Sequence, residues 1–189
     1  VLGYFDGLHK GHQALFEKAR EIATEQDLKI AVLTFPESPK LAFVRYQPEL
    51  MLHLASPEDR MAQLESLGVD YLYLIDFTSH FAGNTARDFF EKYVSRLRAK
   101  AVVAGFDYHF GSDRKESHEL RDYFNGKIVI VPSVNLDNRK ISSTRIRETI
   151  AAGDMLKTQE LLGYPLSTRG IVVHGNARGR TIGYPTANL

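Results

Sequence analysis

The chain has 189 residues, of which 43% are hydrophobic, and it contains no cysteine. Because the chain has 24 basic and 23 acidic residues, a broad basic surface for nucleic acid is not expected. The lack of cysteine excludes disulfides, thiolate zinc sites and cysteine nucleophiles. No apolar run reaches the roughly 20 residues of a membrane span, and no charged-then-apolar leader is visible. We therefore expect a cytoplasmic protein that binds neither membranes nor nucleic acid.

Helix and strand patterns alternate along the chain. Apolar residues at helical spacing, several with capping residues before them, predict helices at residues 10–26, 56–67, 85–97, 116–124, 141–152 and 155–162. Short apolar runs predict a first strand at Val1 and Leu2 and further strands at residues 29–35, 70–76, 100–106 and 127–132. This alternation predicts an α/β fold, a Rossmann-like open parallel sheet with helices on both faces.

The pattern changes after Tyr164-Pro165. Residues 167–174 predict a new strand, and a polar loop follows at residues 176–180. We therefore expect one domain over residues 1–165 and the start of a second domain over residues 166–189.

The first candidate site is the segment GYFDGLHKGH at residues 3–12. It follows a strand, turns through glycines and opens a helix. Free backbone N–H groups and the helix dipole favour an anion at such a place. His9 and His12, with Gly11 between them, add donors that can follow charge onto a phosphate. An isolated H-x-G-H is more often a plain glycine turn, but the strand-turn-helix context favours phosphate binding.

Two further segments follow predicted strands. In Ile141–Arg147, three hydroxyl residues precede a helix, and Arg145 and Arg147 can neutralise oxyanions. Residues 105–111 carry aromatic side chains beside an acid, and Phe106 and Phe110 share a side if the segment is extended. Because ligands bind at the carboxyl ends of parallel strands, all three segments can converge on one ligand.

Two phosphate cradles without a P-loop lysine motif indicate nucleotidyl transfer. That reaction needs an α-phosphate held in line with an attacking phosphate, and positive charge where pyrophosphate develops. His9, His12 and Arg147 fit these electrostatic roles. No general base is required, because the attacking phosphate is already an anion.

The segments GYFDGLHKGH, GFDYHFG and ISSTRIR, in this order and spacing, resemble the bacterial bifunctional riboflavin kinase/FAD synthetase family. They match its FMN adenylyltransferase module, which belongs to the H-x-G-H nucleotidyltransferase superfamily. The tail GIVVHGNARGRTIGYPTANL, residues 170–189, resembles the opening of the riboflavin kinase module, including its Pro-Thr-Ala-Asn motif. The resemblance covers the chain from its first residue to its last.

The resemblance implies transfer of AMP from ATP to FMN, giving FAD and pyrophosphate, with Mg²⁺. It implies catalytic roles for His9, His12 and Arg147. The ATP-binding residues that it implies are Gly3, Phe5, Asp6, Gly7, Gly11, Ser143 and Thr144. It assigns Asp107 and Phe110 to the nucleotide and flavin pocket. In the kinase module it assigns Thr186 and Asn188 to Mg²⁺ and ATP phosphate.

The chain departs from the family pattern at three places. Ser38 stands where the family commonly has the histidine of Thr-Phe-x-Pro-His-Pro, and Glu116-Ser117 replaces the Gly-Asp of Arg-x-Gly-Asp. Ala177 replaces a glycine of the first kinase loop. The ATP-phosphate motifs are intact, so we expect the first two departures to weaken FMN binding.

Two other functions stay open on the sequence. One is a nucleotidyltransferase with another phosphate acceptor, against which the kinase-like tail argues. The other is a non-catalytic nucleotide- or flavin-binding protein, which the changed segment 34–39 favours. The kinase portion is too short to close a β-barrel, so we expect only the incomplete start of that domain, without riboflavin kinase activity. The expected partners are the small molecules ATP and FMN, and the oligomeric state is not predicted.

Overall fold

The computed structural model describes residues 1–42, 52–176 and 178–184. Its parallel strands form two pairs: β1 (Ala31–Thr34) with β2 (Tyr71–Leu74), and β3 (Ala101–Gly105) with β6 (Lys127–Val131). The opening segment, residues 1–3, lies between the two pairs. The Leu33 N–H donates to the Val1 carbonyl at 3.0 Å, and the Leu2 N–H donates to the Val103 carbonyl at 3.1 Å. With this segment counted first, the strands follow the doubly wound order 3-2-1-4-5.

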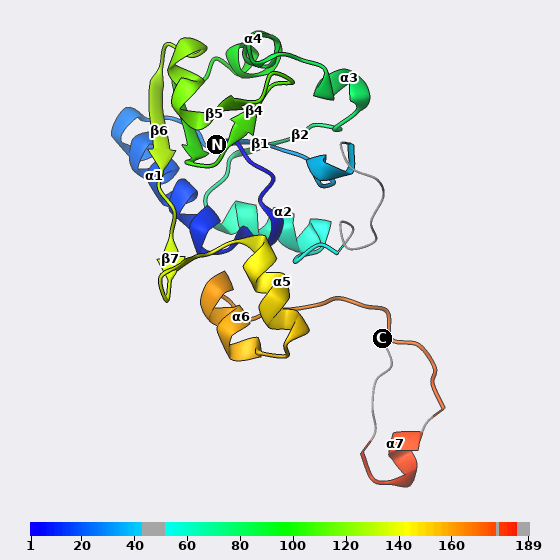
Figure 1. Ribbon diagram of the computed structural model, residues 1–189. Helices are drawn as coiled ribbons and strands as arrows, with labels where there is room; N and C mark the ends of the chain where they lie inside the picture. The colour runs from blue at the N-terminus through cyan, green and yellow to red at the C-terminus, as the bar shows by residue number, and fades with distance from the viewer. Residues whose placement is uncertain (43–51, 177, 185–189) are drawn as a thin grey trace.

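Helices and short turns connect these strands (Figure 1). The α-helices are α1 (Lys10–Gln26), α2 (Pro57–Ser66), α3 (Ser79–Ala82), α4 (Ala86–Phe89), α5 (Ser143–Ala151), α6 (Met155–Leu162) and α7 (Arg178–Thr181). The 3-10 helices are η1 (Asp6–Leu8), η2 (Pro39–Ala42), η5 (Ser95–Leu97) and η6 (Ser117–Asp122), and η4 (Phe90–Val94) is a π-helix. Two antiparallel hairpins pair β4 (His109–Phe110) with β5 (Lys115–Glu116), and β7 (Asn135–Leu136) with β8 (Arg139–Lys140).

The sheet is covered on both faces, as the sequence predicts. Side chains alternate across a strand, so neighbouring residues of β3 enter different cores. Val103 packs with Phe16 of α1 and Leu64 of α2. Val102, its neighbour, packs on the other face with Phe90 and with the residues around α4.

Local signals explain where the predicted helices begin. Ser56 caps α2 by accepting a hydrogen bond from the Asp59 N–H, and Pro57 occupies the first turn. The predicted helix at 85–97 is one irregular helical stretch, in which α4 passes into η4 and then η5. Phe89 and Phe90 are adjacent and both buried. Their rings meet edge-on at 5.5 Å within the core.

The prediction for residues 167–174 is wrong, because no strand longer than a single-residue bridge forms among the described residues there. Ile171, Val172 and Val173 are 84%, 66% and 54% exposed. A strand without neighbours does not hold in water. This part of the chain leads away from the sheet to α7, a helical turn that the sequence did not predict (Figure 1).

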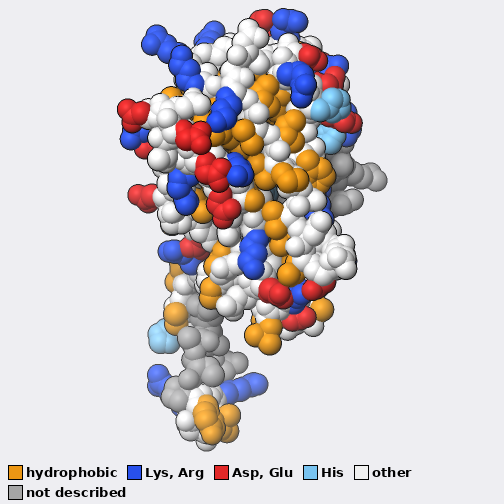
Figure 2. Space-filling model, turned by 90° about the vertical axis from the view of Figure 1, so that its left-hand side faces the viewer, with side chains coloured by type: hydrophobic (Ala, Val, Ile, Leu, Met, Phe, Trp, Pro, Cys, Tyr) orange, Lys and Arg blue, Asp and Glu red, His pale blue; other side chains and the backbone are white. Residues whose placement is uncertain are grey.

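The surface carries mixed charge, in keeping with the net charge of +1. On the face shown in Figure 2, basic and acidic side chains surround a patch of hydrophobic ones. Within the described residues, no helix combines the length and apolar character needed to cross a bilayer.

Candidate functional site

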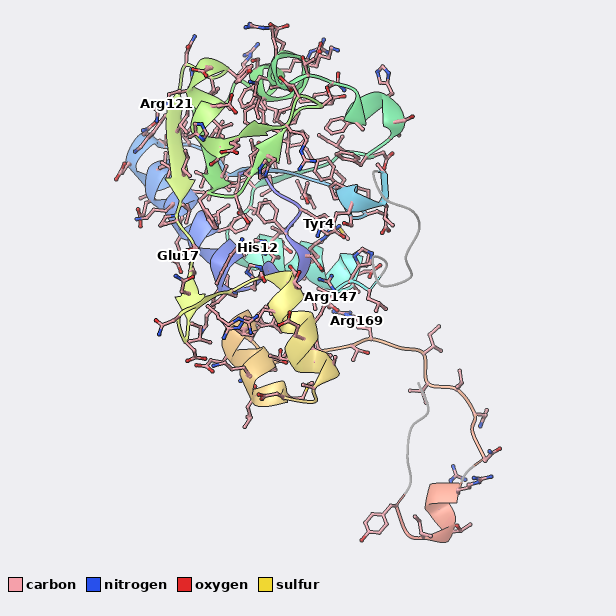
Figure 3. All side chains as sticks on the ribbon, viewed as in Figure 1. Tyr4, His12, Glu17, Arg121, Arg147 and Arg169 are labelled. Carbon is pink, nitrogen blue, oxygen red and sulfur yellow. The ribbon has the colours of Figure 1, made fainter. Side chains whose placement is uncertain are left out.

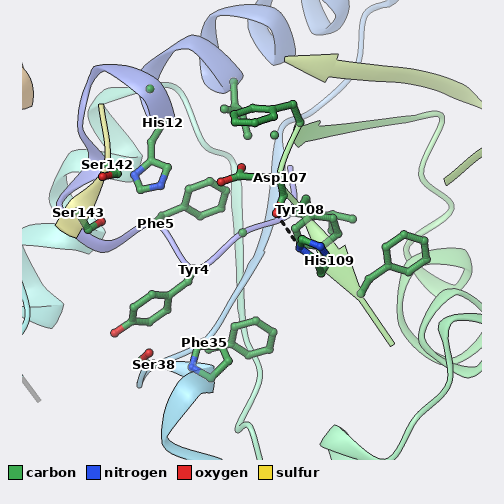
Figure 4. Close-up of a pocket in the computed structure, with 18 of the residues that line it drawn as sticks. Tyr4, Phe5, His12, Phe35, Ser38, Asp107, Tyr108, His109, Ser142 and Ser143 are labelled. Carbon is green, nitrogen blue, oxygen red and sulfur yellow. Dashed lines mark hydrogen bonds between the residues drawn. The ribbon is translucent and has the colours of Figure 1, made fainter. Parts of the chain in front are cut away.

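A cavity of about 990 Å³ lies at the carboxyl edge of the sheet, at the upper end of the range of small-molecule pockets. Its walls come from the residues after the opening segment, after β3 and after β6, and from the start of α5. The three sequence motifs therefore converge, as their places in the topology predict. Figure 4 shows His12, Ser142 and Ser143 at one end of this cavity and Phe35 and Ser38 at the other.

The glycine turn bends through three left-handed residues. Phe5, Gly7 and Leu8 have φ of 60°, 73° and 35°. Gly7 packs so tightly that a Cβ there would lie 2.8 Å from Leu54. At Gly3, a Cβ would lie 2.6 Å from the buried Phe5 ring. The turn needs glycine at both positions, which explains the pattern seen in the sequence.

His9 and His12 form a stacked pair at the start of α1. Their ring centroids are 3.7 Å apart with an interplanar angle of 12°, and the His12 ring meets the edge of Phe5. His9 caps α1, its Nδ1 accepting from the His12 N–H at 3.3 Å. His12 Nδ1 is buried and has no hydrogen-bond partner among the described residues. A buried polar atom without a partner is destabilising, so this nitrogen is a candidate ligand contact.

Burial keeps both rings neutral near pH 7. It lowers the pKa of His9 to about 4 and the pKa of His12 well below its ordinary value. Lys140 lowers both pKa values further by repulsion. A neutral imidazole offers one N–H donor and one acceptor nitrogen. The pair can therefore donate to an anion without carrying a permanent charge.

The start of α5 faces this histidine pair (Figure 4). Ser142 caps the helix, accepting from the Arg145 N–H at 3.3 Å. Ser143 and Thr144 line the cavity beside it. Arg145 does not reach the cavity: it is buried, and its Nη1 donates to the Leu136 and Arg139 carbonyls at 2.8 Å each. Its role is to hold the β7–β8 hairpin.

Asp6 and Arg147 bind each other rather than lining the cavity. Asp6 is buried, and its Oδ1 accepts from the Leu54 N–H at 2.9 Å. Its Oδ2 forms an ion pair with Arg147, whose guanidinium also donates to the Leu52 carbonyl at 3.1 and 2.9 Å. In Figure 3 Arg147 projects from α5 toward the start of the glycine turn. Direct phosphate contact by Arg147 stays a prediction.

Lys140 is a cavity residue that sequence reasoning missed. It forms an ion pair with Asp107, and its Nζ lies 4.7 Å above the Phe106 ring. The signal was available, since Lys140 directly precedes the Ile141–Arg147 motif. Its charge lies in the lining of the same cavity as the His9–His12 pair and the start of α5.

Aromatic rings form the other wall. Tyr108 stacks on Phe110 at 6.0 Å, and Phe35 meets Phe77 edge-on at 5.0 Å. Phe106 and Phe110 do not share a side, because the chain turns after β3: Phe106 is 44% exposed and Phe110 is 5% exposed. The Tyr108 N–H donates back to the Gly105 carbonyl at 3.1 Å, which closes that turn.

A hydrogen-bonded chain that the sequence did not reveal supports the wall near Ser38. The Tyr4 hydroxyl lies 2.9 Å from His53 Nδ1, and His53 Nε2 lies 2.9 Å from a Glu37 carboxylate oxygen. Arg60 lies over the Tyr4 ring at 5.5 Å. Burial and the Asp6 charge raise the pKa of Tyr4 to about 12, so its hydroxyl stays protonated at neutral pH.

Of the two departures expected to weaken FMN binding, only one lies in the cavity. Ser38 lines it, whereas Glu116 and Ser117 do not. Ser117 donates instead to the Phe106 carbonyl at 2.8 Å, behind the wall. The kinase residues Thr186 and Asn188 lie outside the described residues, as does Ala177.

The described residues do not form a metal site made of protein ligands alone. Across residues 1–42, 52–176 and 178–184, no group of three or more His, Asp or Glu side chains could hold a metal ion. Asp6 and Asp107 are each already paired with a cation. Mg²⁺ commonly binds through substrate phosphates and water with few protein ligands.

Comparison with known proteins supports the sequence motifs. The FAD synthetase family model matches residues 1–145, and the riboflavin kinase model matches residues 162–189. The bifunctional riboflavin kinase/FMN adenylyltransferases of Listeria monocytogenes and Bacillus subtilis are 40% and 39% identical to this chain. Both alignments cover 100% of the chain but only 61% and 60% of the relatives.

One solved structure has a very similar fold. It is described as a macrolide-efflux protein from Streptococcus pneumoniae, with a TM-score of 0.95 and 54% identity. The match covers 99% of this chain and 62% of that one. The chain thus spans about 60% of the length of the proteins that it matches.

We predict that Asp6→Asn lowers the free energy of unfolding by about 1–2 kcal/mol. The amide oxygen keeps the Leu54 bond, but the charged contact to the partly exposed Arg147 is lost. Urea unfolding measures the change, and Asp76→Asn is the control because Asp76 is exposed. Equal stability of the two variants would contradict a structural role for the Asp6–Arg147 pair.

Stability should fall in acid, because the pKa of His9 is about 4 in the folded chain and 6.5 is the ordinary value. At pH values between these two, the unfolded state binds more protons than the folded state. The stability linked to His9 is therefore fully present above pH 6.5 and is lost as pH falls toward 4. Going from pH 7 to pH 5 should remove on the order of 2 kcal/mol through His9. Urea unfolding at both pH values checks this, with His9→Asn expected to flatten the dependence; an unchanged slope would contradict it.

Proposed function

Because the chain belongs to the FAD synthetase family, we propose that its cavity transfers AMP from ATP to FMN, giving FAD and pyrophosphate. One observation carries the proposal. A stacked histidine pair, a helix N-terminus and an aromatic wall, coming from three separate segments, line one cavity. The first two suit a polyphosphate, and the third suits a planar ring system.

The ATP phosphates would lie between His12 and the start of α5. The unpartnered Nδ1 of His12 and the free N–H groups of the first turn of α5 are the donors. An oxygen of the FMN phosphate attacks the α-phosphorus of ATP. The bond from that phosphorus to the bridging oxygen breaks, and pyrophosphate leaves with the electron pair. The residues contribute alignment and hydrogen bonds to developing charge.

Lys140 would supply the mobile positive charge. Its present partner, Asp107, is a carboxylate on the exposed turn after β3, and both side chains are about half exposed. An incoming polyphosphate carries more charge than one carboxylate, so it competes well for the ammonium. Mg²⁺ dependence is part of the proposal, with the ion entering on the ATP phosphates.

The aromatic wall would hold the flavin. Phe35, Phe77, Tyr108 and Phe110 present ring faces and edges in this part of the lining, which also contains polar residues such as Ser38 and Asn84. Stacking on aromatic rings suits the isoalloxazine system. This wall favours FMN over an acceptor without a large planar group. We further propose that residues 1–165 form the nucleotidyltransferase module and residues 166–189 the start of a riboflavin kinase module.

The first test of the proposal is His12→Ala. We expect adenylyl transfer to fall about a hundredfold or more, the usual effect of losing a preorganised contact to developing charge. FAD and pyrophosphate release from ATP, Mg²⁺ and FMN is measured. The matched control is His118→Ala, because His118 is exposed and does not line the cavity. Normal turnover in His12→Ala would overturn the assigned role.

The second test concerns Ser38. If the serine replaces a flavin-side histidine, Ser38→His should tighten FMN binding about ten- to a hundredfold, the worth of one charged hydrogen bond. Quenching of FMN fluorescence, with and without a non-hydrolysable ATP analogue, gives the dissociation constant. Ser95→His, on η5 and away from the cavity, is the control. An unchanged or weaker FMN affinity would show that the serine does not limit binding.

A further inference from the structure

All three carbonyl groups of η1 accept a hydrogen bond from a side chain outside η1. The three donors are Ser143 Oγ to the Asp6 carbonyl (3.0 Å), the Tyr164 hydroxyl to the Gly7 carbonyl (2.5 Å), and Gln13 Nε2 to the Leu8 carbonyl (2.8 Å). They come from α5, from the segment after α6, and from α1. The turn is therefore held from three sides.

These bonds offset the strain of the turn. Left-handed backbone at a non-glycine residue is destabilising, and both Phe5 and Leu8 adopt it. Such a turn persists only where its surroundings fix it. A second link ties the same elements together, because Gln13 Nε2 also donates to the Leu162 carbonyl at the end of α6.

Tyr164 is the donor that lies nearest the boundary between the two proposed modules. It lies beyond residues 1–145, which the FAD synthetase model matches, and within residues 162–189, which the riboflavin kinase model matches. Gly163, with φ of 86°, ends α6 and turns the tyrosine back toward α1. Its ring is partly buried against the cluster of Ile141, Leu161 and Leu162. Its hydroxyl alone reaches the glycine turn.

We propose that Tyr164 is a positioning residue for adenylyl transfer: its hydroxyl fixes the Gly7 carbonyl and thereby the placement of His9 and His12. This inference rests on the proposed function. His9 directly follows η1 and caps α1, and His12 stacks on it. A loosened turn therefore misplaces both rings relative to the reacting phosphate. The end of the first proposed module, which the riboflavin kinase model also matches, thereby supports the geometry of the first module's site.

Tyr164→Phe tests the proposal, because it removes the hydroxyl and keeps the ring. We expect kcat for FAD formation to fall about three- to tenfold, the worth of one neutral hydrogen bond, with KM for ATP changed less than twofold. Gln13→Met, which removes the Leu8 donor, should act in the same direction. Thr149→Val is the matched control: its Oγ1 lies 2.8 Å from Thr158 Oγ1, so it loses a bond between α5 and α6 away from the turn.

Amide hydrogen exchange gives a second readout that does not depend on activity. In Tyr164→Phe, exchange should rise at residues 5–11 and stay unchanged in β3. In Thr149→Val it should rise only in α5 and α6. No rise at residues 5–11, or a rise without loss of kcat, overturns the positioning role. If the parent chain forms no FAD, the proposed function fails, and the exchange comparison still decides whether Tyr164 fixes the turn.

Discussion

The left-handed turn after the opening segment is the constraint on which the rest of the structure depends. It reverses the chain within a few residues, so that α1 starts directly at the carboxyl edge of the sheet. Backbone of this kind is destabilising at Phe5 and Leu8. It is held by side chains from α1, α5 and the segment after α6. The Ser143 bond also fixes the start of α5 against the turn, where Ser143 and Thr144 line the cavity.

The electrostatics of the site follow from burial and pairing. The two histidines are neutral because they are buried. Arg147 and Lys140 are each paired with a carboxylate of the chain. Of the cations near the site, Lys140 lines the cavity and Arg147 does not, while Lys40 and Arg114 add two further positive side chains to the lining. An anionic ligand would gain most by exchanging with the exposed Asp107, whereas Asp6 is buried and accepts from a backbone N–H as well.

Local signals predicted the elements well. The bounds of α1 and the cap of α2 follow from spacing and capping residues, and the convergence of the three motifs follows from parallel topology. The sequence could not show that Arg145 would be buried in a structural role, because both arginines of Ile141–Arg147 look alike until the β7–β8 hairpin folds beneath one of them. The contacts of Tyr4, Lys140 and Tyr164 are equally non-local. The hairpins are too short for periodicity to reveal.

The opening segment also has a consequence for folding kinetics. Residues 1–3 are the only link between the β1–β2 pair and the β3–β6 pair that the described hydrogen bonds provide within the sheet. Each pair joins segments well separated along the chain, and the central strand contacts β1 and, much farther along the chain, β3. This topology raises the mean sequence separation of native contacts, which slows folding. A chain in which residues 1–3 are not seated would leave one edge of each pair unprotected, and such edges favour association between chains.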